Sequence, residues 1–308
     1  MNRKASIREG RRGAQGGKWS SILVGSVAMV TLLLGLAACA GAKDTSGTGL
    51  AGSLQVKGSD TMVNLGSAWA EEFMAQNAKV SIAVTGGGSG TGIAALINKS
   101  TDICQASRAI KPEEIDKARS NGVDPKEFVV ALDGLAVVVN PANPVSELTF
   151  AQLADIYTGK ISNWKDVGGK DEVMVVLSRD TNSGTHVFFK EHVLQSKDPR
   201  AEYGGKVQMM AASQAGVIEV RQNPKAIFYV GLGYVGDEMK ALAIKREASS
   251  KAVKPSQETV KSGEYAIARP LYLYTNGEPT GLAKAYIDWI MGADGQRIVR
   301  ELDFVPAQ

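Results

Sequence analysis

The sequence predicts an α/β fold in which parallel strands alternate with helices that cover both faces of the sheet. Three observations lead to this prediction. Short β-prone runs alternate with helical runs along the body of the chain, as parallel sheets require. Turns rich in Gly, Ser and Thr follow several of the strands. About 255 residues lie beyond the N-terminal segments, which suits one or two domains.

The first 38 residues have the composition of a secretory signal. Six basic side chains between Arg3 and Lys18 precede an apolar run from Ile22 to Leu36. The run is shorter than the ~20 apolar residues that a membrane span needs, and Gly and Ser interrupt it. Residues 1–38 are therefore predicted to be a signal peptide and play no part in the predicted fold.

The signal ends in Leu36-Ala37-Ala38-Cys39, which resembles the lipobox of bacterial lipoproteins. The resemblance implies that Cys39 carries a diacylglyceryl group after cleavage just before it. The alternative is an ordinary signal peptide followed by a chance cysteine. Residues 39–53 are predicted to be the lipidated cysteine and a flexible linker, because small and polar residues dominate them. The protein is therefore expected in the cell envelope, anchored by lipid and facing the periplasm or the exterior.

Charge and residue counts exclude several classes of protein. The first 38 residues hold six of the 35 basic and one of the 32 acidic side chains. The remaining chain therefore has 29 basic and 31 acidic side chains, a net charge of −2, which gives no electrostatic footprint for nucleic acid. Beyond Cys39 the sequence has one further cysteine, Cys104, and two histidines, His186 and His192. We therefore expect a buried Cys104, no internal disulfide, no metal site and no cofactor.

The hydrophobic pattern predicts each element of the alternation in turn. We predict strands over residues 54–56, 80–85, 103–106, 135–140, 173–178 and 271–274. We predict helices over residues 62–75, 92–99, 112–120, 150–157 and 185–195. In folds of this kind, ligands bind at the carboxyl ends of the strands, where the strand-to-helix turns gather.

Three of those turns share a composition that suits an oxyanion. They are Gly58 to Thr61, Gly86 to Gly92 and Arg179 to Thr185. Each places Gly, Ser and Thr at a helix N-terminus, where backbone N–H groups are unpaired and the helix dipole favours negative charge. Each turn alone is equally consistent with ordinary N-caps and turn glycines. Three such turns, one of them with an arginine, favour a site that surrounds a tetrahedral anion with donors.

Other phosphate and hydrolase motifs do not fit the glycine-rich turn. It lacks the Lys-Ser/Thr pair of a P-loop, and Thr91 stands where a dinucleotide fingerprint needs its third glycine. A phosphatase that uses Ser59 or Ser89 as nucleophile would need a base or a metal, which the sequence does not provide nearby. We therefore predict a binding protein rather than an enzyme.

Several motifs in order resemble the phosphate-binding proteins of the high-affinity phosphate ABC transporter, the PstS family. The resemblance runs from about Val56 to the C-terminus. The segments that carry it are Gly58-Ser59-Asp60-Thr61, Gly88-Ser89-Gly90-Thr91-Gly92, Ser107-Arg108, residues 153–164, residues 179–185, Ala226-Ile227-Phe228-Tyr229-Val230 and Asp303-Phe304-Val305-Pro306.

The resemblance implies a two-lobed, class II periplasmic-binding-protein fold with the ligand in the cleft between the lobes. The expected lobes are residues 54–135 plus 272–308, and residues 136–271. The expected ligand is inorganic phosphate, and the expected partners are the permease subunits of an ABC transporter, with the protein itself a monomer. By position, the phosphate-binding residues would be Ser59, Thr61, Ser89, Arg179, Ser183, Gly184 and Thr185.

One departure from the family bears on selectivity. Some members carry Ser-Asp where this chain has Ser107-Arg108, and that aspartate accepts a proton from bound phosphate. Here Arg108 would supply positive charge instead. Asp60 is the best remaining acceptor, or else a simple N-cap, and Asp180 is a second candidate. Sulfate, molybdate or another tetrahedral oxyanion is therefore the alternative ligand, and a signalling or adhesive lipoprotein with this fold is a further alternative.

Overall fold

A mixed β-sheet organises the part of the chain that the computed structural model describes, residues 49–307. Its strands are β1 (Gly52–Gly58), β2 (Val80–Thr85), β3 (Ile103–Ala106), β4 (Pro125–Val139), β6 (Val175–Arg179), β7 (Gln208–Met210), β8 (Ala226–Gly231), β9 (Lys240–Ala241), β11 (Ala268–Asn276) and β12 (Val305–Pro306). Their order across the sheet is β2-β1-β3-β11-β4-β8-β6-β7, with β9 and β12 also paired to β4. A separate parallel pair joins β5 (Glu147–Thr149) to β10 (Ala243–Lys245).

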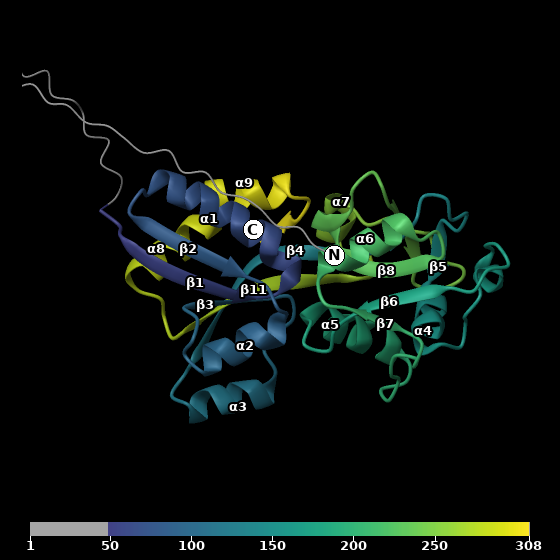
Figure 1. Ribbon diagram of the computed structural model, residues 1–308, viewed down its shortest axis with the longest axis horizontal. Helices are drawn as coiled ribbons and strands as arrows, with labels where there is room; N and C mark the ends of the chain where they lie inside the picture. The colour runs from purple at the N-terminus through teal and green to yellow at the C-terminus, as the bar shows by residue number, and fades with distance from the viewer. Residues whose placement is uncertain (1–48, 308) are drawn as a thin grey trace, which may run out of the picture. The chain divides into compact units, whose positions relative to one another are not determined.

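Helices cover both faces of this sheet (Figure 1). They are α1 (Val63–Gln76), α2 (Ser89–Ile97), α3 (Pro112–Ser120), α4 (Phe150–Thr158), α5 (Gly184–His192), α6 (Ser213–Gln222), α7 (Gln257–Lys261), α8 (Gly281–Met291) and α9 (Ala293–Glu301). Around β1 and β3, the helices α1, α8 and α9 share one hydrophobic core, and α2 and α3 share another on the opposite face. Around β8, α6 packs on one face, and α4 and α5 pack on the other.

The long strand β4 joins two parts of the sheet. Its residues 125–134 pair with β11, and its residues 135–139 pair with β8. We call β2, β1, β3, β11 and residues 125–134 the first half of the sheet. Residues 135–139, β8, β6 and β7 are the second half. Every residue of β4 from Asp133 to Val139 is buried, as expected for a continuous apolar run in a sheet covered on both faces.

The sheet is not wholly parallel, so that part of the sequence prediction was wrong. Pairing is parallel for β1 with β2 and β3, and for β6 with β7 and β8. It is antiparallel wherever β4 or β11 takes part. The local pattern of a buried strand does not encode the direction of its neighbour, and both of these strands read as continuous apolar runs.

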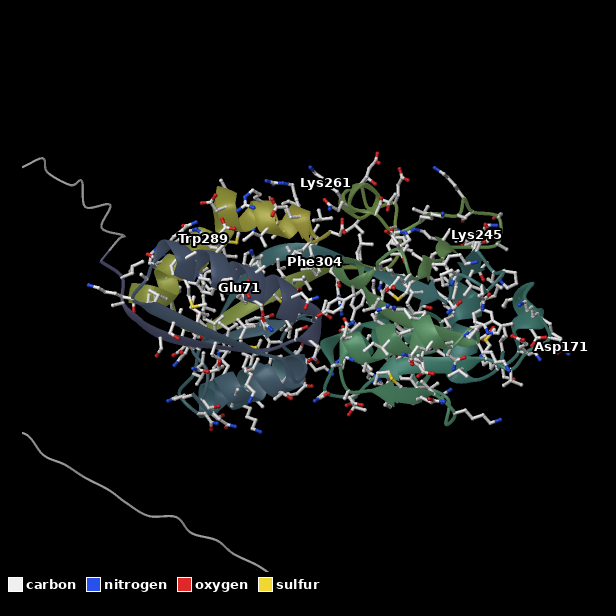
Figure 2. The ribbon with its side chains drawn as sticks, turned by 45° about the horizontal axis from the view of Figure 1, so that its top comes forward. Glu71, Asp171, Lys245, Lys261, Trp289 and Phe304 are labelled. Carbon is white, nitrogen blue, oxygen red and sulfur yellow. The ribbon has the colours of Figure 1, made fainter. Side chains whose placement is uncertain are left out.

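The C-terminal segment closes the core of the first half. Trp69 of α1 is 1% exposed and donates its indole N–H to the carbonyl of Gly295 in α9 at 2.9 Å. Trp289 of α8 and Phe304, which follows α9, pack on the same core (Figure 2). Val305 of β12 belongs instead to the core of the second half. The last residues described therefore contact both cores.

Several predicted elements are confirmed with their bounds, and others are corrected. β2, β3 and α3 occupy the predicted residues, and Cys104 is fully buried and free of any disulfide. Helix α2 begins at Ser89 rather than Gly92, so that Ser89 lies in the helix rather than in the turn before it. The strand predicted over 135–140 is the end of β4. The proposed lobe boundaries stay a prediction, and the signal peptide, Cys39 and most of the linker lie outside the described residues.

Candidate oxyanion-binding site

Three hydroxyl groups from three strand ends meet in the first half of the sheet. Ser59 follows β1, Ser89 begins α2 after β2, and Ser107 follows β3. The hydroxyl of Ser59 donates to that of Ser107 at 2.8 Å, and the hydroxyls of Ser89 and Ser107 lie 3.3 Å apart. All three side chains are buried. The structure thus brings Ser59 and Ser89 together as predicted, and it adds Ser107, which the sequence analysis quoted only as part of a motif.

The N-terminus of α5 brings the second half of the sheet against these hydroxyls. Ser183 caps the helix, because its side chain accepts hydrogen bonds from the backbone N–H groups of Thr185 and His186. Thr185 Oγ1 lies 2.8 Å from Thr61 Oγ1 of the first turn. A Cβ atom on Gly184 would meet the Ser89 side chain and would lie 2.8 Å from Ser107 Oγ. The glycine therefore permits the close approach of this helix to the serine cluster.

The glycine-rich turn and the loop before α5 are also joined directly. The backbone N–H of Gly90 donates to the carbonyl of Asn182 at 2.9 Å. The Asn182 side chain donates in turn to the carbonyl of Gly87 at 2.8 Å and to Thr91 Oγ1 at 3.3 Å. All three of the predicted turns therefore meet in one place, although residues more than 90 positions apart in sequence make these contacts.

Arg179 at the end of β6 is buried and reaches the first half of the sheet. Its Nη2 lies 2.6 Å from Asp60 Oδ2 and donates a second bond to the carbonyl of Ala211 at 3.0 Å. Its Nε donates to the carbonyl of Met210 and its Nη1 donates to Ser213 Oγ. Four of the five N–H groups of the guanidinium are therefore engaged by the protein. These contacts fix the orientation of the side chain, and its charge is paired with Asp60 of the first turn.

Asp60 connects the three turns. Its Oδ2 pairs with Arg179, and its Oδ1 accepts the backbone N–H of Gly87 at 2.9 Å. The side chain is 12% exposed. A carboxylate accepts about four hydrogen bonds, so Asp60 has capacity for a further donor. Asp180, the second candidate acceptor, is half-buried, and its described hydrogen bonds are made by its backbone.

Arg108 takes a position that the sequence did not suggest. It forms a bidentate pair with Glu114 of α3, with both nitrogen–oxygen distances 2.7 Å. Burial lowers the pKa of the Arg108 guanidinium, but the hydrogen bonds and charge of Glu114 outweigh it, so the net shift is upward. Its charge is thus largely neutralised by a neighbour in the same half, and its role as a direct ligand stays a prediction.

A second buried ion pair lies beside the site and was not predicted from the sequence. Arg269 at the start of β11 pairs with Asp133 of β4 at 2.9 Å, and the two side chains are 1% and 0% exposed. Burial is the largest influence on Asp133 and raises its pKa, while Arg269 opposes the shift. Arg269 Nη2 also donates to Thr61 Oγ1 at 3.3 Å and to Thr185 Oγ1 at 3.0 Å. Asp133 was the one signal of this pair in the sequence, because it is an isolated acid beside an apolar run and a buried charge needs a partner.

A buried network behind α5 includes His186. Its Nδ1 lies 3.1 Å from Ser178 Oγ, and its ring stacks on Tyr203 at 4.3 Å between centroids. Ser178 Oγ also lies 2.5 Å from the hydroxyl of Tyr229. Burial lowers the pKa of His186 below its ordinary 6.5. The folded protein therefore holds this imidazole in its neutral form at pH values where an unfolded chain would already protonate it.

This shift predicts acid destabilisation. The contribution of neutral His186 is fully present above about pH 6.5 and is lost as the pH falls through the lowered pKa of the folded state. The free energy of unfolding, measured by urea denaturation, should therefore fall between about pH 7.5 and pH 5.5, and His186→Gln should flatten that decrease. His192→Gln is the matched control on the same helix. An equal pH dependence in wild type and His186→Gln would contradict the assignment.

Residues 49–307 contain neither a cluster of metal-ligating side chains nor a membrane-spanning helix. In residues 49–307, no three His, Cys, Asp or Glu side chains are grouped as a metal site would require. Within the same range, no helix is both long enough and apolar enough to cross a membrane. The candidate site consists of hydroxyl, backbone and guanidinium groups from both halves of the sheet.

Comparison with known proteins matches most of the chain. Residues 43–294 match the family model of a PBP superfamily domain. The chain is 34% identical over 279 residues to the phosphate-binding protein PstS of Staphylococcus saprophyticus, which covers 89% of this chain and 84% of the relative. It is 33% identical over 261 residues to the phosphate-binding protein PstS of Bacillus subtilis, covering 83% and 81% of the two chains.

Solved structures agree with these sequence matches. A phosphate-bound crystal structure from Clostridium perfringens, of a protein assigned as a phosphate ABC transporter substrate-binding protein, has a TM-score of 0.76 and 33% identity. It covers 83% of this chain and 100% of that chain. An ABC-type phosphate transport receptor from Vibrio cholerae has a TM-score of 0.65 and 26% identity, covering 82% and 99% of the two chains.

Proposed function

The chain belongs to the PstS family of phosphate-binding proteins, and on that premise we propose that it binds inorganic phosphate and delivers it to an ABC transporter for import. It has the two-lobed periplasmic-binding-protein fold of that family. The observation that carries the proposal is the convergence of Ser59, Ser89 and Thr61 with Thr185 and Arg179 from the opposite half of the sheet.

This arrangement suits a tetrahedral oxyanion for physical reasons. Hydroxyl groups and the N-terminus of α5 supply donors, and Arg179 supplies charge that offsets the desolvation of a dianion. Donors from both halves would bind the same anion, so phosphate would favour the closed arrangement that a transporter recognises. Asp60 would accept the proton that phosphate carries near neutral pH and sulfate lacks.

The hydrogen bonds of the serines favour binding over catalysis. Ser59 and Ser89 contact Ser107, whereas the two histidines of the described chain contact Ser178 and the carbonyl of Ala266. A serine nucleophile needs a base within hydrogen-bond reach. We therefore propose that the protein has no catalytic role, as expected for a transporter component.

The remaining parts of the proposal concern location and partners. We propose that Cys39 carries a lipid that anchors the protein outside the cytoplasm, and that the protein acts as a monomer with the permease subunits of its transporter. Mass spectrometry of the intact protein from its membrane would test the lipid. An unmodified Cys39, or cleavage elsewhere, would contradict the anchor and leave phosphate binding untouched.

The test of the ligand is calorimetric titration of the full-length protein, stripped of bound anion, with phosphate and then with sulfate. Titrations at about pH 6 and pH 8 vary the protonation of phosphate, whose second pKa lies between these values, while sulfate stays a dianion. Tight phosphate binding with weak sulfate binding is the expected result. Equal binding of the two, or a preference for sulfate, would keep the oxyanion site and contradict phosphate as the transported ligand.

A further inference from the structure

Arg269 lies where the two predicted threonine ligands meet. Thr61 belongs to the first half of the sheet and Thr185 belongs to the second half. Their hydroxyl oxygens are 2.8 Å apart, and Arg269 Nη2 lies 3.3 Å from one and 3.0 Å from the other. An anion that accepts hydrogen bonds from both hydroxyls must therefore lie close to this guanidinium.

The guanidinium of Arg269 has unused donors at this place. Its Nη1 is buried and has no hydrogen-bond partner among residues 49–307, and an unpaired buried donor costs about 1–3 kcal/mol. Arg179 differs, because its Nε, Nη1 and Nη2 all contact protein acceptors. Of these two arginines, Arg269 therefore has more capacity to donate to a ligand oxygen.

Contacts with Asp133 fix the orientation of the Arg269 guanidinium. Its Nε and Nη2 both donate to Asp133 Oδ2, at 3.2 and 2.9 Å. Asp133 is held in turn, since its Oδ1 accepts the backbone N–H of Leu232 at 3.1 Å. The guanidinium carbon also lies 5.4 Å from the centroid of the Phe188 ring, in a cation–π contact. These contacts leave Nη1 of the guanidinium available to donate to a ligand.

A cavity adjoins this arginine. The cavity has a volume of about 570 Å³, and Arg269 lines it together with Phe188 of α5 and Arg108 and Lys111 near α3. Its acidic lining residues are Glu113 and Glu191. Residues of both halves of the sheet therefore form its walls, with three basic side chains against two acidic ones.

We propose that Arg269, oriented by Asp133, is a second arginine that binds the phosphate directly, donating through Nη1 to an oxygen that lies beside the hydroxyls of Thr61 and Thr185. This inference rests on the proposed function and adds a ligand that the sequence motifs did not include. Asp133 is then a positioning residue. Its charge balances Arg269 in the absence of ligand, so that the buried guanidinium is tolerated without an anion.

The first experiment is phosphate titration of full-length Arg269→Lys by calorimetry. Lysine keeps the charge and loses the planar fork, so we expect affinity to fall by about tenfold or more. Arg297→Lys is the matched control, because the Arg297 guanidinium also pairs with carboxylates, those of Glu72 and Glu301, but on helices α1 and α9. The affinity of Arg297→Lys for phosphate should stay within about threefold of that of the wild type.

The outcomes separate the inference from the proposed function. Failure of the wild type to bind phosphate would contradict the proposed function. Wild-type binding together with a loss of less than about tenfold in a folded Arg269→Lys protein would contradict only the role of Arg269. A purely structural role would lower the melting temperature without changing the affinity of the folded protein.

A crystal structure of the wild type with phosphate decides the matter if Arg269→Lys does not fold. A phosphate oxygen within about 3.2 Å of Nη1 or Nη2 would support direct binding. A longer separation from both nitrogens would overturn it.

Discussion

Arg179→Ala is expected to weaken phosphate binding by about 2–5 kcal/mol, the usual cost of truncating one partner of a buried, hydrogen-bonded charge pair. The substitution removes positive charge from the site. It also leaves Asp60, which lies 2.6 Å from Arg179 Nη2, as an unpaired carboxylate beside the incoming anion. Both effects oppose binding. Calorimetric titration measures the loss, with Arg200→Ala as the control because the Arg200 side chain is 94% exposed.

A double substitution separates the two causes. If repulsion from the unpaired Asp60 dominates, adding Asp60→Ala to Arg179→Ala should restore part of the affinity. If loss of the arginine dominates, the double variant should bind no better than Arg179→Ala, and the coupling between the two residues follows from the cycle of single and double variants. Affinity of Arg179→Ala within about threefold of wild type would refute the assigned role.

Gly184→Val is expected to weaken binding by about 1–3 kcal/mol through overpacking between the two halves of the sheet. A Cβ atom at this position would meet Ser89 Oγ and would lie 2.9 Å from Ser89 Cβ and 2.8 Å from Ser107 Oγ. The first turn of α5 would have to move away from the serine cluster. The donors of the two halves would then no longer reach the same anion.

The matched control for this variant is Gly205→Ala. A Cβ atom at Gly205 has no neighbour within 4 Å, so its affinity should match that of wild type. Small-angle scattering on Gly184→Val adds a second readout, because a protein held open should not compact when phosphate is added. Unchanged affinity with normal compaction would show that the close approach at Gly184 is not needed for binding.

The sequence predicted the turns well because their composition reflects local physics. Ser59, Ser89 and Ser183 lie at the starts of helices or directly before them, where small hydroxyl residues satisfy or complement unpaired N–H groups. The ends of parallel strands bring such turns together. Small hydroxyl residues at helix starts and turns at strand ends were therefore sufficient to identify the three segments that meet in the structure.

The ion pairs were less predictable because their partners are distant in sequence. Asp133 and Arg269 are 136 positions apart, and their contact depends on the antiparallel pairing of β4 with β11. Parallel pairing was expected from the sequence, and that pairing does not bring these two residues together. The pairing of Arg108 with Glu114 was also not predicted, although Glu114 is only six positions away on α3; the role of Arg108 as a ligand stays a prediction.

The extent of β4 was also underestimated, for an identifiable reason. Its first residues, Pro125 to Val129, are exposed or half-buried and include charged side chains. An apolar run was found only over the second part, which is buried on both faces. Strand pairing with β11, rather than local hydrophobicity, extends β4 to Pro125.

The pairing of β11 has a consequence for the order of folding. β11 lies between β3 and β4 in the sheet, yet it comes from the last part of the chain, about 130 residues after the end of β4. Until β11 is available, β3 and the first part of β4 present unsatisfied edges to each other. Such distant contacts slow folding, so the first half of the sheet cannot be completed while the chain is still being synthesised. The first half of the sheet can therefore be completed only after the C-terminal segment has emerged, whereas the strands of the second half all precede residue 242.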